Sequence, residues 1–187
     1  MSLRSLLLKR IQKKESFAII ALMETLDRFD IAILKELQDD GRLSNAELAV
    51  RVGLSAAPCW RRVRALEESG FITGYRAEIN RHKMGLGVLA FVRLDADRNS
   101  GDVLQALEDA IRTIPEVISC HYISGTGTFE LQVVSQDLNT FSHFAREVLI
   151  NLPNVKDLHT SFSLGEVKSS SALPLGHLSA PKATRPA

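Results

Sequence analysis

Three arginines and one tryptophan lie next to each other in the segment 55–70, which reads SAAPCWRRVRALEESG. If this segment is a helix, one face carries an apolar stripe at spacing i, i+4 and i+7, made of Cys59, Val63 and Leu66. At 100° per residue, Arg61 and Arg64 point away from that stripe. Trp60 flanks the two arginines, whereas Arg62 lies nearer the edge of the core. Exposed guanidinium groups placed in this way can bond guanine edges or phosphate oxygens of DNA.

The same arginines have a plainer interpretation, as a solvated helix face paired with Glu67 and Glu68. The start of the helix favours the first interpretation, because small side chains such as Ala57 let a helix N-terminus enter the major groove. A recognition helix also needs a short helix and a tight turn in front of it. The preceding residues therefore decide between the two interpretations.

Those preceding residues predict two further helices. An apolar-periodic run begins at Asp27 and ends at the sequence Asp-Asp-Gly of 39–41, where glycine suits a helix end. Ser44, followed three residues later by Glu47, is typical of a capping box, and Gly53 ends this second, short helix. Ser55 is expected to cap the third helix. With a wing or connecting strand that turns at Gly74, residues 26–80 are predicted to form a winged helix-turn-helix domain that binds double-stranded DNA.

A second unit follows after a linker at 81–86. Residues 88–94 predict a strand that is covered on both faces, and 102–114 predict a helix that Pro115 stops. Two β-rich runs at 117–123 and 129–134 enclose a turn, a helix is expected at 140–152, and the last strand carries Leu158, Thr160, Phe162 and Leu164 on one face. The order βαββαβ over 87–168 is that of a ferredoxin-like domain, which makes the whole chain α+β. A sheet covered by helices on one face only predicts a homodimer.

Composition and the two termini limit the remaining choices. The 187 residues carry a net charge of +1, which neither requires nor excludes a nucleic-acid partner. Two isolated cysteines predict free thiols in a reducing compartment, and basic residues interrupt the apolar runs of 1–25, so neither a signal peptide nor a membrane span is expected there. We interpret 1–25 as an N-terminal extension and 169–187, rich in Ser, Pro and Ala, as a flexible tail. The chain is expected to be cytoplasmic and, as a prokaryotic DNA-binding protein, to associate with the nucleoid.

Two stretches of the sequence resemble the Lrp/AsnC family of leucine-responsive or feast/famine regulators. They read LDRFDIAILKELQDDGRLSNAELAVRVGLS and PCWRRVRALEESGFITGYRAEIN, and a weaker third stretch reads SCHYISGTG. The resemblance covers about 26–168 and implies a transcription regulator that forms dimers, octamers or similar rings and senses a small molecule, usually an amino acid. It also implies a DNA-contact set of Ser55, Ala56, Ala57, Pro58, Trp60, Arg61 and Arg64.

The resemblance places the effector, the small molecule that is sensed, at the turn after the second strand of the sensing domain. In this chain that turn is Ser124, Gly125, Thr126, Gly127 and Thr128. Family members often have one or two aspartates in the turn, whereas this chain has threonines, which offer a neutral hydrogen bond instead of a charge for a ligand's ammonium group. The glycines also suit a plain hairpin turn.

Two other functions share this architecture. Some proteins of this type resemble sirohaem decarboxylases, which need groups such as histidine that hold and protonate a tetrapyrrole, and this chain has His121 and His143 in the second unit. Both are isolated, and no catalytic residues, metal site or cofactor are predicted, so we expect no enzymatic activity. A weakly specific architectural DNA-binding protein would carry the same motifs, and the ratio of specific to non-specific affinity at fixed salt distinguishes it.

Overall fold

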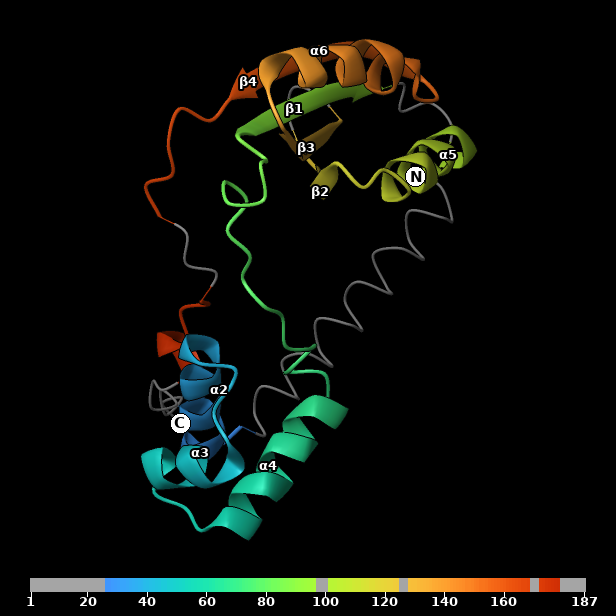
Figure 1. The fold of residues 1–187 in the computed structure, drawn as a ribbon. Coiled ribbons are helices and arrows are strands. Elements are labelled where there is room, and N and C mark those ends of the chain that lie inside the picture. The colour runs from blue at the N-terminus through green and yellow to red at the C-terminus, as the bar shows by residue number, and fades with distance from the viewer. Residues whose placement is uncertain (1–25, 97–100, 125–127, 169–171, 179–187) are drawn as a thin grey trace, which may run out of the picture. The chain divides into compact units, whose positions relative to one another are not determined.

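The chain divides into two compact units (Figure 1). The structure is a computed structural model, and it describes residues 26–96, 101–124, 128–168 and 172–178. The three-helix unit comprises the described residues up to Ala77 together with 172–178, and the sheet unit comprises Glu78 to 168. The division lies three residues before the expected domain end at 80, and the expected N-terminal extension 1–25 lies outside the described residues.

The three-helix unit contains α2 (Arg28–Asp39), α3 (Asn45–Val52) and α4 (Ala56–Glu68). The predicted capping box at the start of α3 is confirmed: the Ser44 hydroxyl accepts the Glu47 N–H at 3.3 Å, and the Glu47 carboxylate accepts the Ser44 N–H at 2.9 Å. Gly53 ends α3 in the left-handed conformation, with φ of 70°, as its position predicts. The beginning of α3 and the turn in front of α4 are therefore set by contacts within residues 44–53.

One apolar cluster joins the three helices. Its buried members are Ile33, Leu48, Ala49, Val52, Cys59 and Leu66. Val63 packs against this cluster, which confirms the predicted apolar stripe of α4, and burial raises the pKa of the Cys59 thiol. Phe71 and Ile72 also pack against it, but residues 73–80, all of which are described, form no strand. The expected turn lies at Gly74, where φ is 151°.

The sheet unit has the predicted βαββαβ order. Its elements are β1 (Val88–Ala96), α5 (Gly101–Arg112), β2 (Val117–Tyr122), β3 (Phe129–Ser135), α6 (Leu138–Glu147), η1 (Leu149–Asn151) and β4 (Val155–Phe162). The strands form one antiparallel sheet in the order β2-β3-β1-β4. α6 ends at Glu147, earlier than the predicted helix 140–152, and the chain continues as the 3-10 turn η1, whose Asn151 amide donates to the carbonyls of Arg146 and Glu147.

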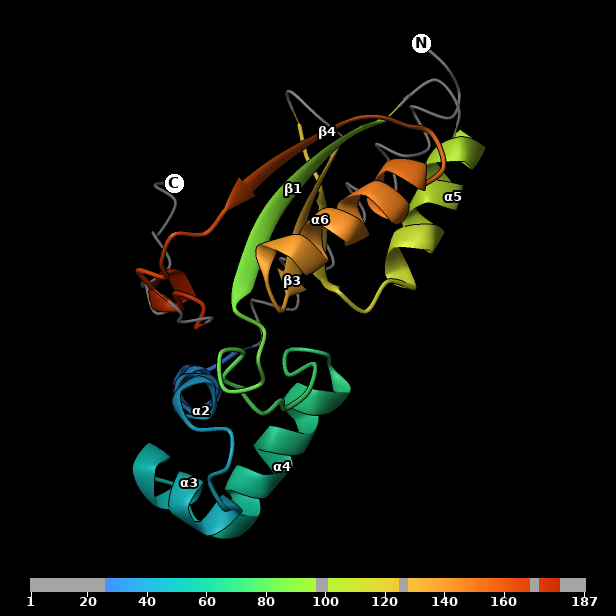
Figure 2. The ribbon, with the colours of Figure 1, turned by 45° about the horizontal axis from the view of Figure 1, so that its top comes forward.

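The two faces of this sheet differ (Figure 2). One face packs against α5 and α6, and its core includes Ala90, Val92, Leu94, Leu107, Leu131, Val133 and Phe141. The opposite face, which we call the open face, carries alternate residues such as Leu89 and Phe91 of β1 and, directly across the strands, Val134 and Gln132 of β3. Leu158 of β4 packs against the core side, and Phe162 contacts the Phe141 ring there, but Leu164 is fully exposed.

The C-terminal residues 172–178 pack against the three-helix unit, although the sequence predicts a flexible tail from 169 onward. The short 3-10 helix η2 (Gly176–Leu178) lies beside α2 (Figure 1), and the backbone of Leu173 bonds the side chain of Gln38. The composition of the tail suggests disorder, yet the apolar spacing of Leu175 and Leu178 gives it two side chains to bury. No helix among the described residues is both long and apolar enough to cross a membrane.

Candidate functional site

The exposed face of α4 carries two arginines. Cys59 and Leu66 hold the helix to the core, so the opposite side faces solvent with Ala57, Arg61 and Arg64. The side chain of Asn45 reaches from the start of α3 to the Ala56 carbonyl, with Nδ2 at 2.8 Å, and so fixes the start of α4. This contact was not predicted from the sequence. The signal that could have indicated it is the amide side chain of Asn45, directly after the Ser44 cap.

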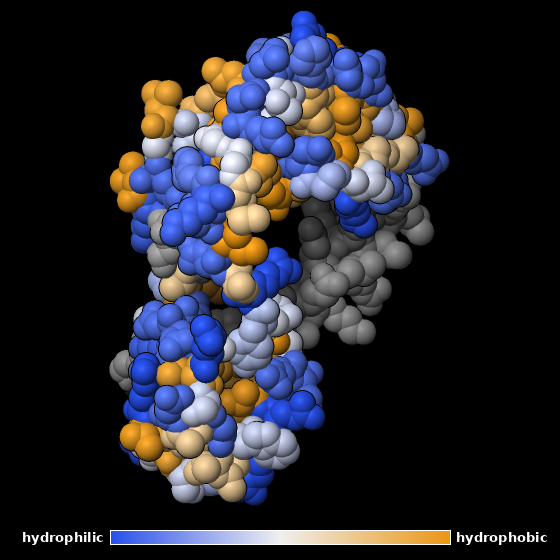
Figure 3. Space-filling view, in the orientation of Figure 1, coloured by the Kyte–Doolittle hydropathy of each residue, from blue (hydrophilic) through white to orange (hydrophobic). Residues whose placement is uncertain are grey.

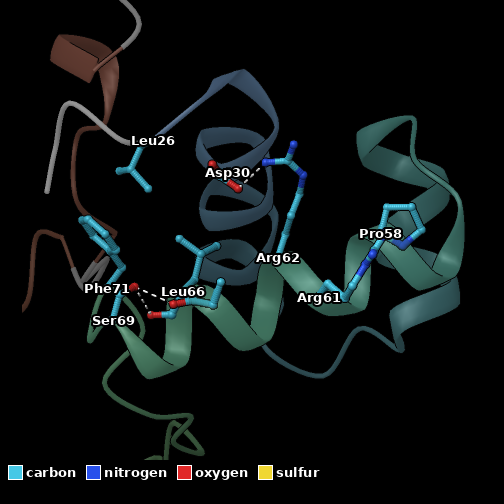
Figure 4. Close-up of a pocket in the computed structure, with 9 residues that line it drawn as sticks. Leu26, Asp30, Pro58, Arg61, Arg62, Leu66, Ser69 and Phe71 are labelled. Carbon is cyan, nitrogen blue, oxygen red and sulfur yellow. Dashed lines mark hydrogen bonds and ion pairs between the residues drawn. The ribbon is translucent and has the colours of Figure 1, made fainter.

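The three arginines of α4 have different surroundings. Arg62 places its two terminal nitrogens 2.8 Å from carboxylate oxygens of Asp27 and Asp30, as Figure 4 shows for Asp30, and its guanidinium lies 5.4 Å from the centre of the Phe29 ring. The hydrogen bond to Asp30 raises the pKa of Arg62 despite partial burial. Arg62 therefore holds α4 against the start of α2, and its charge is already neutralised within the protein.

Asp27 completes this arrangement, since it also caps α2. Its carboxylate accepts the N–H groups of Phe29 at 2.8 Å and Asp30 at 3.0 Å. Burial acts to raise the pKa of Asp27, but these backbone hydrogen bonds and the Arg62 guanidinium outweigh it and keep the pKa below its usual value. One carboxylate thus links a helix cap to an ion pair between α2 and α4.

We expect Arg62→Ala to destabilise the three-helix unit by about 1–2 kcal/mol, because two carboxylates and an aromatic ring lose the same partner. Urea unfolding at neutral pH measures this change. The contribution of ionised Asp27 is present above its unfolded pKa, near 3.8, and is lost as the pH falls through the lower folded value. The difference between wild type and variant should therefore shrink near pH 3.

Arg51→Ala is the matched control, because it breaks one exposed ion pair, to Glu36 at 3.1 Å. Its expected cost is within about 0.5 kcal/mol. If both variants lose the same stability, Arg62 has no structural role beyond that of an ordinary surface charge.

Arg61 and Arg64 remain available to a ligand. Arg61 is exposed and forms no ion pair with any residue that the structure describes, and it borders an open pocket of about 510 Å³ together with Pro58 (Figure 4). Arg64 has only a long contact of 3.8 Å to Glu67 and lies 5.8 Å from the ring centre of Trp60, whose side chain is 54% exposed. Such a weak surface pair leaves a guanidinium free to bond a polyanion.

The start of α4 differs from the expectation in one respect. The predicted position of the cap is confirmed, since Ser55 is the N-cap residue of α4, but the expected hydrogen bond from its side chain is absent. The Ser55 carbonyl accepts the Cys59 N–H at 3.2 Å, which is the first hydrogen bond of α4. Ser55, Ala56 and Ala57 are all exposed, and Pro58 is half-buried.

Only the two ends of the proposed effector turn are described. Ser124 is exposed, whereas Gly125, Thr126 and Gly127 lie outside the described residues. Thr128 is fully buried, and its hydroxyl accepts the Ala96 N–H at 3.0 Å and lies 3.1 Å from the Ala96 carbonyl, to which it can donate. Its own N–H donates to the Leu94 carbonyl at 2.8 Å. Thr128 thus anchors the turn to the end of β1.

The open face has an apolar end and a charged end. Leu89, Ile118 and Val134 line a cavity of about 680 Å³ together with Ile79, Met84 and Leu86 of the preceding segment. At the other end, Arg93 pairs with Glu130 at 3.3 Å and His159 lies 3.2 Å from Asp157. In Figure 3, hydrophobic side chains reach the surface of the sheet unit among hydrophilic ones. The apolar end of the open face, which lies on the opposite side of the sheet from α5 and α6, fits association with a second copy.

The two histidines of the sheet unit lie on opposite faces of the sheet. His121 stands directly across from Glu130 on the open face, whereas His143 is on α6, which covers the other face, and lies 3.7 Å from Glu147. The sheet therefore separates the two imidazoles. Among the residues that the structure describes, no three His, Cys, Asp or Glu side chains gather as a metal site requires.

Comparison with known proteins gives matches for both units. Residues 26–73 match the family of winged helix-turn-helix DNA-binding domains, and residues 89–173 match the Lrp/AsnC ligand-binding domain. The leucine-responsive regulatory proteins of Escherichia coli K12 and Klebsiella pneumoniae are each 42% identical over 148 residues, which is 79% of this chain and 90% of theirs.

Solved structures agree with these matches. A transcriptional regulator of Neisseria meningitidis in complex with L-Met is 41% identical, with a TM-score of 0.79 over 82% of this chain and 99% of the other. An AsnC-family regulator of Agrobacterium tumefaciens is 32% identical, with a TM-score of 0.77 over 81% and 99% of the two chains.

Proposed function

The chain belongs to the Lrp/AsnC family of DNA-binding transcriptional regulators, and from this we propose that α4 reads DNA through Arg61 and Arg64 while the sheet unit binds an apolar amino acid. The observation that carries the proposal is the division of the α4 arginines: Arg62 is neutralised by two aspartates, whereas Arg61 and Arg64 face solvent. Arg61 and Arg64 lie on the same exposed side of a helix that follows a capped helix and a glycine turn, which is the context of a recognition helix.

The DNA-contact set that we propose consists of Ser55, Ala56, Ala57, Pro58, Trp60, Arg61 and Arg64. The small residues and Ser55, whose hydroxyl makes no capping hydrogen bond, lie at the N-terminal end of α4, where backbone N–H groups favour a phosphate. The two arginines follow one turn later, at a distance from which they reach base edges. A dimer presents two such helices, so the target is an imperfect palindrome with half-sites one helical turn, or a multiple, apart. The protein would thus act at the nucleoid.

We propose that the open face forms the dimer contact. A second copy would cover Leu89 and Phe91, and the row of Arg93 with Glu130 would come to lie within the contact. Burial of such a row favours one register of the two sheets, because a charge left unpaired in the contact is costly. This arrangement supports a stable dimer from which larger rings can assemble.

The effector that we propose is an amino acid with an apolar side chain, such as leucine or methionine. Two relatives at 41–42% identity are described as leucine-responsive or as bound to L-Met. The proposed site is the turn from Ser124 to Thr128, in which Thr128 positions the backbone and the exposed Ser124 and the residues 125–127 contact the ligand. Thr126 in place of an aspartate would offer the ligand's ammonium group a neutral hydrogen bond instead of a charge, because the Thr128 hydroxyl is already bonded to Ala96.

A thermal-shift screen against the twenty amino acids, their keto acids and sirohaem tests this proposal. At a hundredfold excess over Kd, binding stabilises the folded state by about 2.7 kcal/mol, which raises Tm by several degrees. We expect a shift with leucine or methionine and none with aspartate or lysine. A shift only with sirohaem would instead support the enzyme of this architecture, for which the separated His121 and His143 are poorly placed.

A further inference from the structure

The three-helix unit has an apolar groove that is not formed by its helices alone. Leu34 and Leu37 of α2 form one side, and Phe71, Ile72 and Tyr75, which follow α4, form the other. All of these except Tyr75 are partly buried side chains that pack against the core of the unit. The groove and residues 173–178 together enclose a cavity of about 620 Å³, so the C-terminal segment lies along the groove instead of filling it completely.

Polar contacts fix the position of the segment along the groove. The Leu173 N–H donates to Oε1 of Gln38 at 2.6 Å, and Nε2 of the same amide donates to the Leu173 carbonyl at 3.4 Å. One side chain thus satisfies both backbone groups of one residue, as a neighbouring strand would. The segment then turns, with the Leu178 N–H bonded to the Leu175 carbonyl at 3.1 Å.

Because of this turn, the three leucines of the segment differ in how far they are exposed. Leu175 and Leu178 are half-buried and line the cavity, whereas Leu173 is 68% exposed and contributes through its backbone. Two leucines that bury part of their surface in an apolar groove stabilise the binding of a segment as short as this one. Leu175 and Leu178 therefore provide the apolar contact between the segment and the groove.

We propose that residues 172–178 act as a C-terminal clasp, which binds the groove of the DNA-binding unit of its own chain and ties that unit a second time to the sheet unit. The occupant is the segment that the structure places in the groove, through the bonds between Leu173 and Gln38 and the burial of Leu175 and Leu178. Residues 163–171 connect this segment to the end of β4 and span at most about 30–35 Å when extended. The first connection is the segment after Ala77, in which Arg81 donates to the carbonyls of Leu86 and Gly87.

A second connection has a consequence for DNA binding, and this part rests on the proposed function. A DNA-binding unit that is tied at one point can take many positions relative to a dimer core, whereas one tied at two points is restricted. A clasped dimer should therefore tolerate fewer half-site spacings than an unclasped one. The clasp would set which spacing of palindromic half-sites the regulator accepts.

Hydrogen exchange of the full chain without DNA tests the clasp itself. In Leu175→Asp/Leu178→Asp, the amides at the C-terminal end of α2 and at 71–75 should exchange roughly tenfold faster than in the wild type, because their apolar cover is lost. Leu164→Asp is the matched control, since this leucine is fully exposed and lies on the same connection, and it should leave exchange unchanged. Gln38→Ala should give a smaller increase in the same amides.

Equal exchange in the double variant and the wild type would overturn the clasp, whatever the protein does with DNA. A second measurement compares affinity for palindromes whose half-sites are moved apart by half and by whole helical turns. The double variant should lose discrimination between whole-turn spacings, while Leu164→Asp keeps it. If exchange rises but the spacing preference is unchanged, the clasp stabilises the unit without setting the spacing, and that part of the proposal is wrong.

Discussion

Arg61→Ala should weaken binding to the cognate DNA site by about 1–3 kcal/mol, which is roughly a five- to 150-fold rise in Kd. Arg61 is exposed on the face of α4 opposite the core and has no ion pair among the described residues, so its substitution removes a DNA contact without removing an internal one. Fluorescence anisotropy at fixed salt, with the cognate site and a scrambled duplex, measures the change. The loss should be larger on the cognate site.

Arg64→Ala should act in the same direction with a smaller loss, because Arg64 has a competing contact of 3.8 Å to Glu67. The matched control is Arg112→Ala in the sheet unit, an arginine that is 71% exposed and makes only long ion pairs. It removes the same charge away from α4 and should change Kd little. An equal loss on both duplexes after Arg61→Ala would make Arg61 a phosphate contact, and the specificity would then have to come from other residues.

Thr128→Val should destabilise the sheet unit by about 1–3 kcal/mol and reduce the response to the effector. Valine keeps the shape of threonine but removes the hydroxyl, which leaves the buried N–H of Ala96 without its acceptor. The side-chain hydrogen bonds that hold the effector turn to Ala96 at the end of β1 would then be lost. Urea unfolding measures the first effect, and the thermal shift with the amino acid found in the screen measures the second.

Thr128→Ser separates anchoring from packing, because serine keeps the hydroxyl and loses only a methyl group. We expect Thr128→Ser to retain most of the effector response and Thr128→Val to lose it. A Thr128→Val protein that responds to the amino acid like the wild type would show that the turn needs no anchor at Thr128, and the proposed role of Thr128 would be wrong.

Several features of this protein can be predicted from local signals alone. The Ser44 and Glu47 capping box, the left-handed Gly53 and the apolar stripe of α4 are set by residues within one or two turns of each other, so periodicity and capping predict them. The βαββαβ order follows in the same way from alternating apolar patterns and turn residues. The outward direction of Arg61 and Arg64 needed only the 100° step of a helix.

Which arginine of α4 pairs within the protein depends on how α4 packs against the start of α2. The pairing of Arg62 with Asp27 and Asp30 joins residues more than thirty positions apart, and no local pattern encodes such a pair. Thr128 is a second example of a long-range contact. Its place in the effector turn predicts a ligand contact, but its hydroxyl is buried against Ala96 at the end of β1. The contact of Leu173 with Gln38 spans 135 positions, and the sequence there resembles a disordered tail. Long-range contacts such as these depend on how separate elements pack, and local sequence patterns carry no information about that packing.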